Sequence, residues 1–274
     1  MRSRNDISWW VLLVLIAASV GCSQPEPAAP GTAFYPDQGN LFSQSEAERD
    51  SVLAALATVR QQAFQEAFSL LPEYVFTRYT RTEQFDDEDY LVAYTERTVH
   101  HTQENDVRST TVESADSAGA FDFGFFKRFV SENVDDIDPV NLAPHLIPKD
   151  PPYLAARNYD LYLYRFLSDT LLWDAMARVI EIRARPEAAD GKNIRRVRLF
   201  VDRGTNELVA MYLERIDLAL FFREESQYYV HIRRAPDGEW VPYNSRFHTL
   251  IRTPLQTAQQ FRTVSTYYDY APVG

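Results

Sequence analysis

Residues 178–185 read Arg-Val-Ile-Glu-Ile-Arg-Ala-Arg, and this stretch decides the fold class. Within it, apolar and charged side chains alternate as Ile180, Ile182 and Ala184 against Glu181, Arg183 and Arg185. A period of two places the two sets on opposite sides of an extended chain. The stretch therefore predicts a β-strand in a sheet that has one face on the core and one face in water.

The same alternation recurs downstream in two predicted hairpins. The first turns at residues 203–206 and the second at residues 235–238, where glycine, proline, asparagine and aspartate favour tight turns. We therefore expect residues 173–270 to form a near-continuous series of antiparallel strands. The side chains predicted to turn inward are Ile180, Ile182, Val197, Leu199, Val201, Tyr228, Val230, Ile232, Val241, Tyr243 and Phe247.

One helix and several strands are predicted ahead of this series. Ser45 and Glu48 have the spacing of a capping box, and apolar residues then recur at helical intervals from Val52 to Leu71. Pro72 stops this single amphipathic helix, which needs the sheet as a surface to cover. The further strands expected are residues 74–80, 90–102, 107–112 and 159–167.

Composition indicates one folded domain that does not bind nucleic acid. The chain has 274 residues, of which 45% are hydrophobic and 14% aromatic, enough for a packed core. Its net charge is −11, which disfavours a polyanionic partner. The basic runs at residues 195–198 and 233–234 are interpreted as solvated strand faces. We predict a single α+β, mainly β domain over residues 45–274.

The amino terminus predicts a lipid-anchored envelope protein. Arg2 and Arg4 precede an apolar run at residues 7–20, which is short for a membrane span but suits a secretory signal. Residues 19–22 read Ser-Val-Gly-Cys, like the lipobox of a bacterial lipoprotein in which Cys22 is acylated. Cys22 is the single cysteine, so no internal disulfide forms. The alternative is an uncleaved anchor helix with an incidental cysteine.

The predicted layout is a signal peptide over residues 1–21 and a lipidated tether over residues 22–44. Residues 23–40 are rich in proline, alanine and glycine and show no periodicity, as expected of a flexible linker. Ser23 follows the cysteine, and this pattern predicts the periplasmic side of the outer membrane. The expected partner is thus the membrane itself, through the lipid anchor.

The sequence offers little sign of catalysis. It contains no nucleophile elbow, zinc-binding His-Glu-x-x-His or phosphate loop, and we predict no enzyme activity, no metal and no cofactor. His100 and His101 are adjacent on a predicted strand, so they point to opposite faces and do not chelate one ion. Of the other histidines, His145 lies in the irregular segment, and His231 and His248 lie on predicted strand faces rich in charged residues, where they are expected to be solvated or paired. Asp135, Asp136 and Asp138 form an acidic turn that lacks the rest of a calcium loop.

Residues 119–158 form an irregular insertion, and long irregular segments are commonly functional or disordered. Five phenylalanines gather near its start: Phe121, Phe123, Phe125, Phe126 and Phe129. Two interpretations stay open for this cluster. It plugs the core, or it forms a mobile apolar flap over a cavity or towards lipid.

The chain resembles the outer-membrane lipoprotein-sorting family of LolA-, LolB- and RseB-like carriers and sensors. The residues that carry the resemblance are the lipobox, the N-terminal helix, Trp173, residues 201–209 (Val-Asp-x-x-Thr-x-x-Leu-Val) and residues 238–242 (Gly-Glu-Trp-Val-Pro). The resemblance implies a strongly curved antiparallel half-barrel, closed by helices around a cavity for acyl chains. The phenylalanine segment would correspond to a lid. The ligand-binding residues expected on this basis are Phe121, Phe123, Phe125, Phe126, Phe129, Trp173, Tyr228 and Trp240.

Two functions follow from this interpretation. The first is a carrier or chaperone that shelters acyl chains or lipoproteins, each buried methylene contributing about 0.8 kcal/mol. The second is an interaction or sensor module of an envelope protein complex, with a filled core and no ligand. An envelope hydrolase that uses spatially gathered carboxylates is a third, less favoured hypothesis.

Overall fold

The structure is a computed structural model, and it describes residues 44–104, 107–122, 151–172, 175–185, 193–219, 222–254 and 257–273. The chain divides into two compact units, Met1–Leu41 and Phe42–Gly274. All described residues belong to the second unit. The predicted signal peptide, most of the predicted tether and most of the phenylalanine cluster lie outside the described residues.

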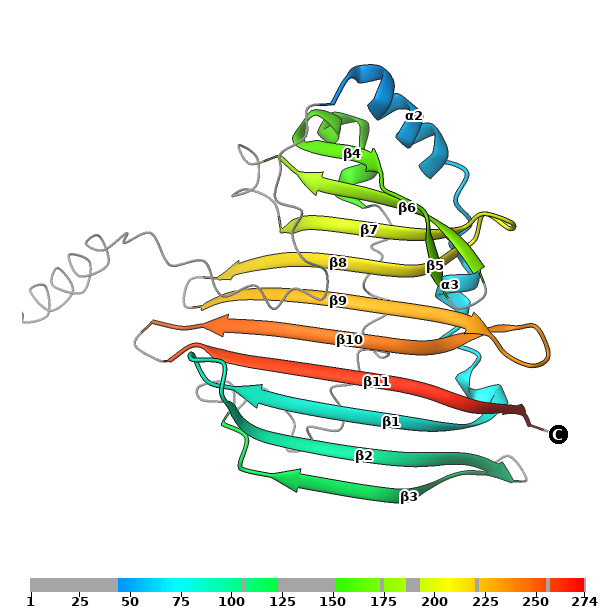
Figure 1. Cartoon of the computed structure of the whole chain (residues 1–274), viewed down its shortest axis with the longest axis vertical. Coiled ribbons are helices and arrows are strands. Elements are labelled where there is room, and N and C mark those ends of the chain that lie inside the picture. Colours follow the sequence, from blue (N-terminus) through cyan, green and yellow to red (C-terminus); the bar gives the residue numbers. More distant parts are fainter. Residues whose placement is uncertain are drawn as a thin grey trace, which may run out of the picture. The chain divides into compact units, whose positions relative to one another are not determined.

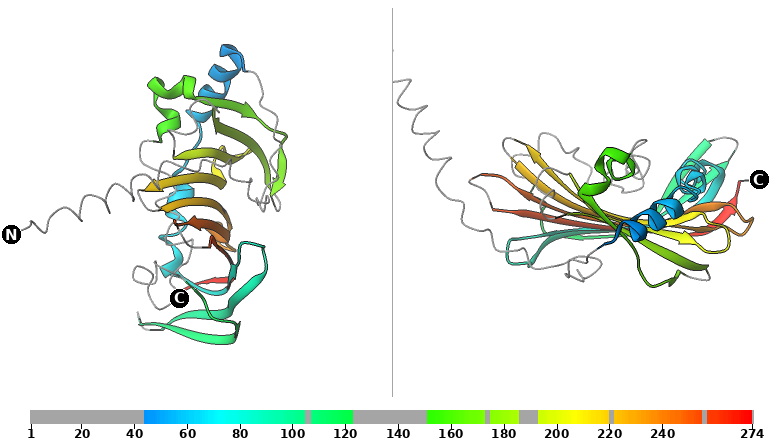
Figure 2. Two further views of the ribbon diagram at one scale, coloured as in Figure 1. Left: turned by 90° about the vertical axis from the view of Figure 1, so that its left-hand side faces the viewer. Right: turned by 90° about the horizontal axis from the view of Figure 1, so that it is seen from above.

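Within the described residues, eleven strands form one antiparallel sheet in the order β3-β2-β1-β11-β10-β9-β8-β7-β6-β4, with β5 paired to β6 (Figure 1). The strands are β1 Tyr74–Phe85, β2 Leu91–Glu104, β3 Val107–Ala118, β4 Tyr162–Phe166, β5 Thr170–Leu172, β6 Ala175–Ala184, β7 Ile194–Asp202, β8 Leu208–Ala219, β9 Phe222–Arg234, β10 Trp240–Arg252 and β11 Gln259–Pro272. Figure 2 shows that the sheet is twisted and curved. The mainly β, curved antiparallel fold predicted from the sequence is confirmed.

The hairpin turns have the geometry that their residues favour. In the β7–β8 turn, the Asp202 carboxylate accepts hydrogen bonds from the backbone of Gly204 and Thr205 at 2.8 and 2.7 Å. Asn206 adopts a φ of 60°, and Gly238 in the β9–β10 turn adopts 95°. Both residue types tolerate this left-handed backbone, so the strands can reverse tightly at the predicted positions.

One face of the sheet, here called the inner face, is apolar across its centre. The strand register places Val197 between Ile182 and Leu213, and Tyr228 between Leu213 and Phe247. Side chains on this face from β6 to β10 are buried: Ile180, Ile182, Val197, Leu199, Val201, Met211, Leu213, Tyr228, Val230, Ile232 and Phe247. Most of the predicted inward set is confirmed.

Val241 and Tyr243 are exceptions, because β10 carries a bulge between Pro242 and Asn244. A bulge inserts one residue and reverses the alternation of faces. Val241 pairs with Arg233, and Tyr243 packs edge-on against His231 at a ring distance of 5.5 Å. Both therefore lie on the opposite, outer face.

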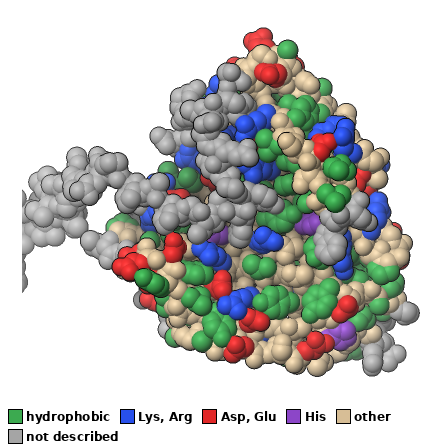
Figure 3. All heavy atoms as spheres, in the orientation of Figure 1, with side chains coloured by type: hydrophobic (Ala, Val, Ile, Leu, Met, Phe, Trp, Pro, Cys, Tyr) green, Lys and Arg blue, Asp and Glu red, His purple; other side chains and the backbone are tan. Residues whose placement is uncertain are grey.

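The outer face is not the wet surface that alternation predicted. Glu181 is 1% exposed and accepts hydrogen bonds from Arg198 at 2.8 Å and from Arg165 at 2.7 Å. Arg196 and Arg198 are buried as well, so interpreting this basic run as a solvated strand face was wrong. The alternation of apolar and charged side chains separates the two faces of a strand. It does not reveal that charged side chains can be buried when they form ion pairs with one another. One face of the molecule shows basic, acidic and apolar side chains interspersed (Figure 3).

Two helices replace the single one predicted after Ser45. They are α2, Glu46–Leu56, and α3, Gln62–Glu66, and Figure 2 shows α3 lying over one side of the sheet. The chain breaks between them because Arg60 forms a parallel bridge with Glu207 at the start of β8. The capping box is confirmed: Ser45 caps the Glu48 backbone, and the Glu48 carboxylate accepts from the Ser45 backbone at 2.8 Å.

Three short 3-10 helices also occur in the described residues. They are η1, Leu71–Glu73, η4, Pro152–Leu154, and η5, Ala156–Leu161. The strand predicted over residues 159–167 is shorter than expected, since η5 extends to Leu161 and β4 spans Tyr162–Phe166. In the parts of the chain that the structure describes, no helix is long and apolar enough to cross a membrane.

Candidate functional site

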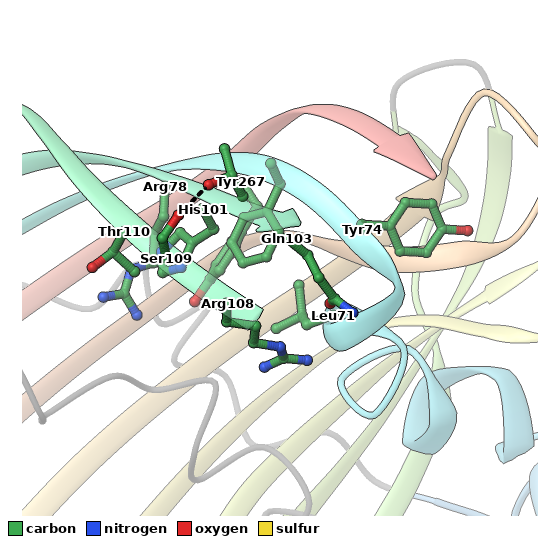
Figure 4. A pocket seen from close by; sticks show the side chains of 11 residues that line it. Leu71, Tyr74, Arg78, His101, Gln103, Arg108, Ser109, Thr110 and Tyr267 are labelled. Carbon is green, nitrogen blue, oxygen red and sulfur yellow. Dashed lines mark hydrogen bonds between the residues drawn. The ribbon is translucent and has the colours of Figure 1, made fainter. Parts of the chain in front are cut away.

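A groove of about 290 Å³ opens on the inner face where η1, β1, β2, β3 and β11 meet (Figure 4). The register brings its walls together: Phe76 pairs with His101, His101 with Thr110, and Arg78 with Tyr267. Directly paired residues project from the same face of an antiparallel sheet. Leu71 from η1 also lines the groove.

The floor of the groove is a cluster of packed aromatic rings. The Phe76 ring stacks on His101 at 4.4 Å and lies 6.0 Å from the Tyr267 ring. It also stacks on Tyr270 at 5.6 Å, and Tyr270 meets Tyr74 edge-on at 5.6 Å. The phenylalanine and tyrosine rings are buried and make a rigid apolar surface.

Hydrogen bonds to the neighbouring turn and strand hold two of these rings in place. The Tyr74 hydroxyl donates to the Asp237 carboxylate at 2.6 Å, and the Tyr270 hydroxyl donates to the Pro242 carbonyl at 2.7 Å. Burial and the Asp237 hydrogen bond raise the pKa of Tyr74, while the bond from Tyr74 lowers the pKa of Asp237. The floor is thus fixed before any ligand arrives.

The rim of the groove is polar and basic. Arg78 on β1 and Tyr74 lie at opposite ends, and Arg108 on β3 lies between them (Figure 4). Arg108 is exposed, and no described residue forms an ion pair with it. The described lining residues include no aspartate or glutamate. The groove therefore combines an apolar floor with a positively charged rim.

A second cleft of about 430 Å³ lies between α2 and β4. Val52, Tyr164 and Phe166 supply its apolar side, while Glu48 and Arg165 carry opposite charges beside it. Glu48 and Arg165 are already engaged in the capping box and the Glu181 cluster. This cleft therefore lacks the unopposed charge that marks the first groove.

The centre of the inner face is filled. Tyr228 packs against Phe247 with ring centroids 4.9 Å apart and is 6% exposed. Val197 is 0% exposed and Val230 is 1% exposed. The open volumes described above lie at the two ends of the sheet, and the rows between them are close-packed.

The predicted ligand residues do not gather at one place. Tyr228 lies in the filled centre, whereas Trp240 lies at the far end of the β9–β10 hairpin, where its indole donates to Glu207 at 3.0 Å. Phe121 follows β3 and is half-buried. Phe123, Phe125, Phe126, Phe129, Trp173 and Cys22 lie outside the described residues. Their predicted roles stay predictions.

The histidines form no metal site in the described chain, where no group of three potential ligands occurs. His100 and His101 face opposite sides, as predicted: His100 contacts the Thr77 hydroxyl at 3.1 Å, and His101 stacks on Phe76. His231 and His248 are buried rather than solvated. Burial and nearby arginines lower the pKa of each to about 4.

The residues of the groove were missed at the sequence level. Tyr74, Phe76 and Arg78 alternate on one predicted strand face, and this was the available signal. What the pattern could not show is that β1 joins β11, which brings Tyr267 and Tyr270 against Phe76. That contact joins segments from opposite ends of the domain sequence, and only the order of strands in the sheet creates it.

Comparison with known proteins finds likenesses among solved structures. No protein-family model and no curated protein matches the chain. A LolA superfamily protein from Nitrosomonas europaea aligns at 12% identity and a TM-score of 0.23, covering 83% of this chain and 94% of that one. A DUF1329 family protein from Desulfovibrio piger aligns at 11% identity and a TM-score of 0.26, covering 81% of this chain and 92% of that one.

A third solved structure is an outer membrane lipoprotein-sorting protein domain from Vibrio parahaemolyticus. It aligns at 9% identity and a TM-score of 0.27, covering 82% of this chain and 93% of that one. The first and third of these structures carry the name of the family that the sequence resembles. At these identities and TM-scores the likenesses transfer no function.

Proposed function

We propose that the protein is anchored in the cell envelope through a lipid on Cys22 and binds the acyl chain of an amphiphile in the groove between η1 and β3. The observation that carries the proposal is the aromatic floor of that groove, formed by Tyr74, Phe76 and Tyr267. An apolar floor of fixed shape suits a flexible hydrocarbon chain. The function is therefore carrier-like binding without chemistry.

The size of the groove limits what it holds. Its volume of about 290 Å³ lies at the lower end for small-molecule sites, so it suits one short chain or the end of a longer one. Each methylene that leaves water contributes about 0.8 kcal/mol. A segment of about eight carbons would thus contribute roughly 6 kcal/mol before the entropy of binding is subtracted.

Filling the groove tests this proposal. Thr110 is exposed on β3 and lines the groove, so Thr110→Trp should occupy the ligand space without disturbing the core. We expect binding of a fluorescent fatty acid to fall at least tenfold while the melting temperature stays unchanged. Thr111, the next residue on β3, is exposed and faces the opposite side. Thr111→Trp is the matched control, and equal binding by both variants would contradict the proposal.

The filled centre of the inner face favours a second candidate function. Because the rows from β6 to β10 are close-packed, the fold also suits an interaction module that docks an envelope assembly without a ligand. Native mass spectrometry of the purified protein separates the two functions. A co-purifying lipid or added fatty acid supports the carrier, and its consistent absence supports the interaction module.

The anchor is tested independently of the groove. Cys22 is the single cysteine and follows Ser-Val-Gly, so Cys22→Ala should remove the acylated residue and release the protein from membranes. Fractionation of cells that express this variant measures the release. Retention of the variant in the membrane fraction at the original level would contradict anchoring through Cys22.

A further inference from the structure

We infer that the groove selects amphiphiles with an anionic head, a carboxylate or a phosphate monoester, and that Arg108 binds this head at the β3 rim of the groove. This inference rests on the proposed function, since it assigns the head group of the same ligand. The inference goes beyond the proposed function because an apolar floor alone does not distinguish an anionic head group from a neutral or cationic one.

The charge distribution carries the inference. The chain has 28 basic and 39 acidic residues, so acidic side chains outnumber basic ones. The described residues that line the groove nevertheless include Arg78 and Arg108 and no carboxylate. Arginines elsewhere on the sheet commonly face a carboxylate, as Arg81 does with Glu96 at 2.7 Å and Arg203 with Asp169 at 2.6 Å. Arg108 departs from that rule, because no described residue forms an ion pair with it.

The arrangement of the residues matches an amphiphile. Arg108 and Thr110 are alternate residues of β3 and therefore share a face, with Gln103 of β2 opposite Arg108. Guanidinium, hydroxyl and amide groups all donate hydrogen bonds, and the guanidinium fork binds carboxylate or phosphate oxygens in pairs. The rings of Phe76 and Tyr267 lie below this rim. A head group at the rim thus leaves its chain over the floor.

Arg108 fits the role of a ligand contact rather than a structural one. It is exposed, it lies on the edge strand of the sheet, and no described residue neutralises it. Removing its charge should therefore leave the fold intact. Arg157 supplies the matched control, because it is also exposed but lines neither the groove nor the α2–β4 cleft.

The experiment measures calorimetric binding to the full-length protein in phosphatidylcholine nanodiscs, with empty nanodiscs subtracted. The probes are octyl phosphate, octanoate, octyl glucoside and inorganic phosphate, each below its micellar concentration. We expect octyl phosphate and octanoate to bind at least tenfold more tightly than octyl glucoside. Inorganic phosphate should bind far more weakly than octyl phosphate, because it lacks a chain to cover the floor.

Variants then assign the preference to one residue. Arg108→Gln should weaken octyl phosphate binding about tenfold, the order expected for one charge-assisted contact, and should leave octyl glucoside unchanged. Arg108→Lys should keep most of the preference, and Arg157→Gln should keep all of it. Unchanged melting temperatures confirm that these variants fold.

The outcomes separate this inference from the function on which it rests. Equal binding of octyl phosphate and octyl glucoside, or a preference that survives Arg108→Gln, overturns the anionic head while chain binding stands. Inorganic phosphate that binds as tightly as octyl phosphate shows a site for a free anion and also overturns the inference. If no octyl compound binds, the inference and the proposed function both fail.

Discussion

Glu181 keeps its charge at a position from which water is almost excluded. Burial acts to raise the pKa of its carboxyl, but the hydrogen bond from Arg198 and the charges of Arg198 and Arg165 outweigh burial and lower the pKa. Arg196 approaches the same carboxylate at 3.9 Å. The buried charges of Glu181 and the surrounding arginines therefore neutralise one another on the outer face. Removing one of these side chains would leave a buried charge uncompensated.

Glu181→Gln tests this dependence. We expect it to lower the free energy of unfolding by about 3 kcal/mol, since it leaves buried arginines without their counter-ion. Glu96→Gln is the control, because Glu96 forms a half-exposed pair with Arg81 and its loss should cost less than about 1 kcal/mol. Urea denaturation measures both variants. Equal losses would show that the Glu181 cluster contributes no more than a surface pair.

Gly119 directly follows β3 at a point where no side chain fits. Its φ is +74°, and a Cβ there would lie 2.1 Å from the Val92 carbonyl oxygen. Gly238 has a φ of +95°, but a Cβ at that position would meet no atom within 4 Å. Both glycines thus adopt a backbone conformation that is unfavourable for other residues. Only at Gly119 would an added side chain also clash with neighbouring atoms.

Gly119→Ala should therefore destabilise the protein more than Gly238→Ala. We expect about 1 kcal/mol of unfolding free energy to be lost at Gly238 from backbone strain alone. At Gly119 a further loss of roughly 1–3 kcal/mol should follow, because β2 and β3 must separate. Thermal unfolding of the two variants provides the measurement. Equal melting temperatures would contradict the close approach of Gly119 to Val92.

At the scale of elements, the strands follow from local patterns more closely than the helices do. The β7–β8 and β9–β10 hairpins form where residues 203–206 and 235–238 predict turns, because their backbone preferences are local. The helical periodicity after Ser45 is local too. It did not reveal the break at residues 57–61, which depends on a bridge between Arg60 and Glu207.

The cap of α2 gives a prediction at this scale. Ser45→Ala should remove the side-chain acceptor for the Glu48 backbone and cost the helix about 1 kcal/mol. Hydrogen exchange should speed up in the first turn of α2 and stay unchanged in β7 and β8. Unaltered exchange at Glu48 would mean that packing against β4, rather than the cap, holds this end.

For the whole molecule, two buried histidines link folding to pH. The pKa of His231 and of His248 is lowered to about 4, mainly by burial and then by Arg233 and Arg262 respectively. In the unfolded chain both should titrate near a pKa of about 6.5. Between these values the unfolded state binds more protons than the folded state, so stability rises with pH across this window.

We therefore expect the free energy of unfolding to fall as the pH is lowered from about 6.5 towards 4. Urea denaturation at several pH values measures this slope. The double variant His231→Gln, His248→Gln should flatten it, whatever its effect on stability at neutral pH. A slope that is unchanged in the double variant would assign the acid sensitivity to other groups.

The sequence by itself determined that the chain builds an antiparallel sheet. It also determined which side chains of a strand share a face and where the central hairpins turn. These properties come from side-chain alternation and local backbone preference, and both are written in neighbouring residues. Tertiary structure alone decided the rest. Pairing β1 with β11 made the groove, a bulge moved Tyr243 to the outer face, and mutual pairing buried Glu181. Each of these depends on contacts between residues far apart in the chain, which no local pattern encodes.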